Sequence, residues 1–201
     1  MEQAALGFRA HSGWTAVVAV ALENSKPRVL ARQRTHLVET FTYYFRQPFH
    51  TAKRMGVEKG SGFVSGVASE ARRLAEEAIR SFQTSLRKEN YELSRCGLVL
   101  ASGNALPTLD RILASHALIH TADGTLFREA LLDASKRCGL TAFTIKEREL
   151  PETASQVLRV KGDALTRRLT ALGKEFGAPW SQDEKLAALA GWLALSQRKN
   201  S

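Results

Sequence analysis

Two histidines four positions apart form the most chemically suggestive pair in this sequence. His116 and His120 precede Asp123, and on a helix residues i and i+4 share one face. Two imidazoles in that arrangement could hold zinc, but the zinc-protease motif needs a glutamate where Ala117 stands. A third ligand would have to come from elsewhere, for example from Glu129. The commoner alternative is that such histidines hydrogen-bond the backbone at a helix junction.

Polar and basic residues also follow the ends of several predicted strands. The first strand is expected at Leu6 to Ala10, with His11 directly after it. In open α/β sheets, ligands bind beyond the carboxyl ends of the strands. We therefore expect a pocket at this edge, lined by Arg9, His11, Ser12, Glu39, Ser102, Asn104 and Glu147. The simpler alternative is that turns alone favour serine, glycine and asparagine at such positions.

The histidine pair could belong to the same pocket. His116 and His120 follow the fourth predicted strand, and we expect that segment to fold back so that both line one pocket with His11. An imidazole there could act as a general base or bind a phosphate group. The sequence assigns no catalytic residue, no set of metal ligands and no cofactor.

An aromatic segment between the third strand and the first long helix offers a different chemistry. Its rings could stack on unpaired bases while neighbouring cations follow the phosphates. The residues concerned are Phe41, Tyr43, Tyr44, Phe45 and Phe49, with Arg46, Lys53 and Arg54 between and after them. A strand extension in the core, or a contact in a homodimer, would explain the same residues.

Glycines follow this aromatic segment, and the pattern predicts a mobile linker. The stretch Met55 to Gly66 is not a nucleotide-binding P-loop, because Lys59 precedes Ser61 with a glycine between them. We therefore expect residues 40–64 to form an irregular excursion from the fold. No serine-protease-like nucleophile motif accompanies it.

The remaining elements follow from hydrophobic periodicity. Apolar runs predict strands at Trp14 to Leu22, Arg28 to Val38, Cys96 to Ala101 and Leu140 to Ile145. The strand at Trp14 to Leu22 is apolar almost throughout, as expected for a strand covered on both faces. The strand at Arg28 to Val38, the third along the chain, has one basic face, which is typical of a position nearer a sheet edge.

Helices are expected between and after these strands. They cover about Ser65 to Asn90, Pro107 to Ser115 and a segment capped by Thr121 that stops at Gly139. A C-terminal helical pair is predicted over residues 152–197. The apolar stripe of its first member is interrupted at Gly162, and its last helix begins with the capping box of Ser181 and Glu184.

The order strand, strand, strand, helix, strand, helix, strand, helix resembles the ribonuclease H-like superfold of Holliday-junction resolvases and actin-like ATPases. The resemblance covers nearly the whole chain and implies one α/β domain over residues 1–201. It implies a five-stranded mixed sheet in the order 3-2-1-4-5, flanked by helices.

The carboxylates of the nucleases in this superfold are largely missing. Those enzymes carry acids on the first strand, at the end of the fourth strand and on the last helix, where they hold two divalent ions. Here only Asp183 and Glu184 match, at the start of the last helix. The actin-like ATPases use the turn after the first strand as a phosphate loop, and His11 to Thr15 resembles it in position but lacks its acidic residue.

Composition bears on partners and compartment. The formal net charge of +9 over 201 residues favours polyanions, and the excess is spread along the chain. Cys96 and Cys138 have no paired-cysteine motif and are interpreted as reduced packing residues. No apolar run reaches the roughly 18 residues that span a bilayer, so we expect a cytoplasmic protein without membrane contact.

Three functions stay open on this evidence. The first is a ribonuclease H-like domain that is not a nuclease and binds nucleic acid or another phosphate-bearing ligand. The second is a metal- or histidine-dependent enzyme at the edge formed by His11, His116 and His120. The third is a structural or protein-binding module, for which a homodimer is one possibility.

Overall fold

The computed structural model describes residues 1–101 and 105–197. Their centre is a five-stranded sheet in the order β3-β2-β1-β4-β5, which confirms the predicted order. The first three strands form an antiparallel meander, and β4 and β5 run parallel to β1. The strands are β1 (Glu2–His11), β2 (Trp14–Glu23), β3 (Lys26–His36), β4 (Tyr91–Leu100) and β5 (Thr141–Lys146).

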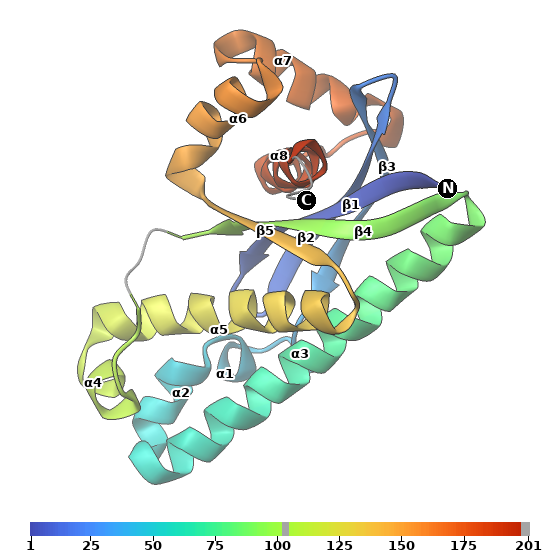
Figure 1. Ribbon diagram of the computed structural model, residues 1–201. Helices are drawn as coiled ribbons and strands as arrows, with labels where there is room; N and C mark the ends of the chain where they lie inside the picture. Colours follow the sequence, from blue (N-terminus) through green and yellow to red (C-terminus); the bar gives the residue numbers. More distant parts are fainter. Residues whose placement is uncertain (102–104, 198–201) are drawn as a thin grey trace.

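Helices cover both faces of the sheet (Figure 1). On one face lie α1 (Tyr43–Arg46), α2 (Pro48–Met55), α3 (Val57–Lys88), α4 (Leu109–Ala114) and α5 (His116–Arg137). On the other lie α6 (Leu150–Leu158), α7 (Gly162–Leu172) and α8 (Gln182–Ser196), with short 3-10 turns at Glu147–Glu149 and Lys174–Phe176. No helix in the described parts of the chain is long and apolar enough to cross a membrane.

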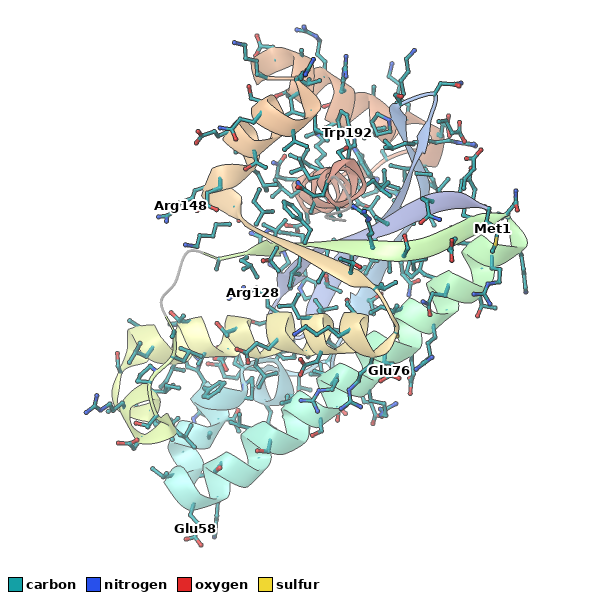
Figure 2. The ribbon with its side chains drawn as sticks, in the orientation of Figure 1. Met1, Glu58, Glu76, Arg128, Arg148 and Trp192 are labelled. Atoms are coloured by element: carbon teal, nitrogen blue, oxygen red, sulfur yellow. The ribbon has the colours of Figure 1, made fainter. Side chains whose placement is uncertain are left out.

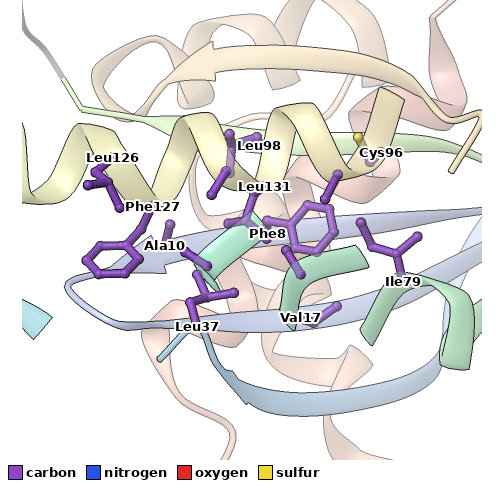
Figure 3. Close-up of a cluster of buried hydrophobic side chains, with 14 of the residues drawn as sticks. Phe8, Ala10, Val17, Leu37, Ile79, Cys96, Leu98, Leu126, Phe127 and Leu131 are labelled. Atoms are coloured by element: carbon purple, nitrogen blue, oxygen red, sulfur yellow. The ribbon is translucent and has the colours of Figure 1, made fainter. Parts of the chain in front are cut away.

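Alternating side chains of the central strands pack into two separate hydrophobic cores, one on each face of the sheet. Phe8 and Val17 pack toward α3 and α5, whereas Val18 and Val20 pack toward α8. Figure 3 shows the first core, in which Leu131 of α5 lies close to Phe8. This double coverage explains why β2 is apolar along nearly its whole length.

Residues 40–64 differ from the mobile linker that their glycines predicted. They form α1, α2 and the first two turns of α3, which begins at Val57 instead of near Ser65. Gly60 lies inside α3 against Ala52 of α2, and a side chain at position 60 would press on the Ala52 backbone and Cβ. Close packing of α2 on α3 therefore offsets the low helix propensity of glycine, which costs about 1 kcal/mol per residue.

One other helix prediction needs correction. Helix α5 begins at His116 with Ser115 as its cap, so Thr121 lies inside the helix. The first member of the C-terminal pair is interrupted at Gly162 as expected and consists of α6 and α7, with Arg159 and Gly162 at positive φ angles of 54° and 55°. The capping box of Ser181 and Glu184 at the start of α8 is confirmed.

Candidate functional site

The carboxyl ends of β1, β3, β4 and β5 lie at one edge of the sheet, beside the amino end of α8. Side chains alternate along β1, so Phe8 and Ala10 enter the core beneath α5. Gly7, Arg9 and His11 consequently face α8. The edge on the α8 face is thus formed by basic residues of β1 and acidic residues that follow β5 or open α8.

A compact charge cluster occupies this edge. The Arg9 Nη2 atom lies 2.7 Å from Glu147 Oε2, and the His11 Nε2 atom lies 2.9 Å from Asp183 Oδ1. Arg9 Nε lies 4.0 Å from the same Asp183 oxygen and is a buried donor without a hydrogen-bond partner. A guanidinium and an imidazole therefore stand beside the two acids at this edge.

The second acid of α8 is engaged in structural contacts. Glu184 Oε1 accepts a hydrogen bond of 2.9 Å from Arg32 on β3, and its other oxygen accepts from the backbone and hydroxyl of Ser181. Arg32 also donates to the carbonyls of Phe176 and Pro179. Glu184 thus fixes the entry of α8 onto the sheet.

Stacked rings and guanidinium groups continue from the charge cluster toward β3. The His11 ring stacks on Trp14 with 4.4 Å between centroids, and Arg34 Cζ lies 3.9 Å above the Trp14 ring. Phe41 follows, 5.8 Å from Arg34 Cζ and 4.4 Å from Arg46 Cζ. We call His11, Trp14, Arg34, Phe41 and Arg46 the stacked row.

The turn between β1 and β2 holds one end of this row in place. Arg46 Nε donates to the Ser12 carbonyl over 3.2 Å, and the Leu37 amide donates to the Gly13 carbonyl over 2.8 Å. Gly13 has a φ of 81°, and a side chain there would strike the Arg46 stem. The predicted site residue Ser12 therefore contributes a backbone contact that positions Arg46.

One further arginine adds positive charge near the cluster. Arg128 of α5 lies between that helix and the sheet (Figure 2). Burial, and secondly the nearby charge of Arg9, lower the pKa of the Arg128 guanidinium. No salt bridge among the described residues involves Arg128, and the nearby charge of Glu129 offsets only part of the lowering of its pKa.

The structure brings together only part of the predicted site. Arg9, His11, Ser12 and Glu147 lie at the edge, whereas Ser102 and Asn104 fall outside the described residues. Glu39 instead pairs with Arg73 of α3.

The expected pocket of His11 with His116 and His120 is wrong. His11 lies on the α8 face of the sheet, whereas the other two open α5 on the opposite face and contact His50. Strands β1 and β4 are parallel neighbours as expected, but the alternation of side chains along β1 directs His11 away from α5.

Trp14 and Arg34 belong to this edge but were not predicted from the sequence as site residues. Trp14 and Arg34 lie on adjacent antiparallel strands, and their proximity depends on the register that pairs Trp14 with His36. The only available signal was the basic face of the third strand, which includes Arg32 and Arg34. Their aromatic partner is not visible in a single-strand pattern.

Comparisons with known proteins bear on the fold. No protein-family model and no curated protein matches the chain. Among solved structures, the RuvC protein of Thermus thermophilus is similar with a TM-score of 0.53 and 11% identity, covering 96% of this chain and 93% of the other. The same protein in complex with a Holliday-junction substrate matches with a TM-score of 0.53 and 10% identity over the same shares. The chain therefore has the ribonuclease H-like fold found in RuvC.

Proposed function

We propose that this domain binds nucleic acid at the carboxyl edge of its sheet and does not cleave it by two-metal chemistry. The observation that carries the proposal is the stacked row, in which Arg34 lies over the Trp14 ring and Arg46 over the Phe41 ring. The rings hold the guanidinium planes of Arg34 and Arg46 in place, and such planes can stack on unpaired bases while their charge neutralises phosphates. Unpaired bases, in a single strand or at a junction, suit this surface better than the interior of a duplex.

The cations of the row keep their charge available for phosphate. Among the described residues, no salt bridge involves Arg34 or Arg46. In contrast, Arg73 and Arg80 on α3 pair with Glu77 and Glu76 at 2.7 Å. The net charge of +9 adds long-range attraction for any polyanion.

The charge cluster argues against bound Mg²⁺ at the nuclease position. A divalent ion needs carboxylate oxygens free to coordinate it. Here Asp183 already accepts from His11, and Arg9 places a fixed positive charge beside it. Electrostatic repulsion from Arg9 would oppose a metal ion in that space.

The likeness to RuvC supports the proposal through the fold. RuvC has been seen in complex with a Holliday-junction substrate, so a domain of this architecture can present a surface to branched DNA. The basic and aromatic edge of the present chain supplies groups suited to the same class of ligand. A smaller phosphate-bearing molecule would use the charge of the same arginines but not the stacking of their guanidinium planes on bases.

The test is fluorescence anisotropy with a labelled single strand, a duplex and a four-way junction at several salt concentrations. We expect salt-sensitive binding that is strongest for probes with unpaired bases. Replacing Arg34 and Arg46 by glutamine should lower the salt slope on single strands by about 1.4, since each phosphate contact contributes about 0.7. Replacing Trp14 by leucine removes the ring that supports Arg34 and should weaken binding of every probe.

The matched control replaces Arg73 and Arg80 by glutamine. This double variant removes the same two positive charges from the paired arginines of α3. Equal losses in both double variants would mean that net charge alone attracts the probe, and no binding at low salt would refute the proposal. Binding of inorganic phosphate at Arg34 without oligonucleotide binding would indicate a small phosphorylated ligand instead.

A further inference from the structure

Three of the five histidines gather on the face of the sheet opposite the charge cluster. His116 and His120 lie in the first two turns of α5, and His50 approaches them from α2. The ring centroids are 4.4 Å apart for His116 and His120, 4.5 Å for His50 and His120, and 5.5 Å for His50 and His116. Each ring offers one nitrogen, and these three nitrogens all lie within 4.8 Å of one another.

A buried carboxylate holds one of the three rings. His50 Nδ1 lies 2.5 Å from Asp123 Oδ2, while Asp123 Oδ1 accepts the Phe49 backbone amide over 2.7 Å. The Asp123 side chain is only 3% exposed. When His50 Nδ1 carries the proton it donates to Asp123, and Nε2 then keeps a lone pair for a metal ion. Metal-binding histidines characteristically donate their second nitrogen to a carboxylate in this way.

From these contacts we propose that His50, His116 and His120 bind one zinc ion, with Asp123 as a positioning residue. Imidazole nitrogens suit Zn²⁺, whereas Mg²⁺ and Ca²⁺ prefer oxygen ligands. Zinc–nitrogen bonds of about 2.0–2.1 Å in tetrahedral geometry place ligand atoms about 3.4 Å apart. The present nitrogens lie within 4.8 Å of one another, so rotation of the exposed His116 and His120 rings would have to close the remaining difference.

The arrangement leaves one coordination position for water. His116 and His120 are exposed, so the metal would face solvent on their side. Zinc sites with three protein ligands and one water differ in this respect from closed structural sites with four protein ligands. The third ligand comes from His50 on α2 and not from Glu129, the candidate suggested by the sequence.

The site would also join two helices that are distant in sequence. His50 lies in α2 and the other two ligands in α5, and these helices pack against each other beside the core. Zinc that binds the native chain and not the unfolded chain shifts the folding equilibrium toward the native state. At a zinc concentration a hundred times the dissociation constant, we expect the melting temperature to rise by about 5–10 °C.

The experiment uses the full chain, free of any affinity tag and stripped of metal with a chelator. Titration with Zn²⁺ should show one ion per chain, and Co²⁺ should give the intense visible bands of tetrahedral coordination. His116→Gln and His50→Gln should each lose the cobalt bands and weaken zinc binding by at least about 100-fold. The matched control is His36→Gln, because His36 lies on β3 outside the cluster and should leave both signals unchanged.

Asp123→Asn separates a positioning role from a purely structural one. Loss of such an outer carboxylate weakens metal binding by about 10–100-fold. A structural role alone would lower the melting temperature of the metal-free protein but leave the zinc affinity of the folded fraction unchanged, which would remove Asp123 from the proposal. Absence of saturable zinc binding, or equal binding by wild type and His116→Gln, would overturn the site itself. None of these measurements involves nucleic acid, so they stand apart from the test of the sheet edge.

Discussion

Gly7 of β1 and Ala187 of α8 meet backbone to backbone. A methyl group added at Gly7 would overlap the Ala187 carbonyl oxygen, and one added at Gly97 of β4 would overlap the Ala190 carbonyl in the same way. Helix α8 therefore lies directly on β1 and β4. This close approach brings Asp183, at the amino end of α8, within 2.9 Å of His11.

The first prediction concerns this contact. Gly7→Ala should destabilise the protein by about 3 kcal/mol or more, because a backbone carbonyl cannot move aside as a side chain can. Gly62→Ala is the control: nothing lies within 4 Å of a Cβ at that position, and α3 should gain about 0.5–1 kcal/mol from the better helix former. Urea unfolding of both variants measures the difference. Similar stability of Gly7→Ala and wild type would contradict the close packing of α8.

The second prediction concerns the central strand. Val18 of β2 is fully buried between α8 and the sheet, so Val18→Asp should prevent folding. The desolvation penalty of several kcal/mol for an unpaired carboxylate is large beside a total stability of about 5–15 kcal/mol. Val57→Asp is the control, because Val57 is 50% exposed at the start of α3, where a negative charge is favourable. Circular dichroism melting distinguishes the two, and a cooperatively melting Val18→Asp protein would refute the prediction.

The third prediction concerns cleavage. Purified protein should not cut single strands, duplexes or four-way junctions in Mg²⁺ or Mn²⁺, because the acids Asp183 and Glu147 pair with His11 and Arg9. Gel electrophoresis of labelled substrates over long incubations is the measurement. Metal-dependent cleavage that Asp183→Asn abolishes would falsify the absence of two-metal chemistry.

The fourth prediction concerns pH. Burial raises the pKa of the Cys96 thiol from 9.0 to about 11, although the nearby Ser135 hydroxyl opposes part of this shift. Between these two values the unfolded chain loses the proton first, so stability falls as pH rises, by up to about 2–3 kcal/mol in total. Below pH 9 this contribution to stability is fully present.

The free energy of unfolding, measured by denaturant titration at pH 8, 9, 10 and 11, reports this effect. Cys96→Ala serves as the comparison, because the alanine variant retains every other titrating group and should lose stability less steeply with pH. Parallel curves for the two proteins would show that Cys96 does not titrate in this range. At pH 8, an alkylating reagent should modify the partly exposed Cys138 before Cys96.

The strand order and the buried strands were predictable from the sequence because their signals are local. A strand such as β2, which is apolar at nearly every position, buries its side chains only if other elements cover both faces of the sheet. The capping box of Ser181 and Glu184 likewise fixes the start of α8 through contacts within four residues. The order 3-2-1-4-5 then followed from the resemblance to a known superfold.

The tertiary structure alone decided which side chains meet across distant segments. The glycines of residues 56–66 suggested a linker, but packing against Ala52 makes the segment helical. The pairing of His116 and His120 was visible as a four-residue spacing, whereas His50 joins them only because α2 folds onto α5. His11 was assigned to the wrong face, since sequence spacing gives the alternation along a strand but not which side each helix covers. Local patterns determine the elements, and long-range packing determines the sites.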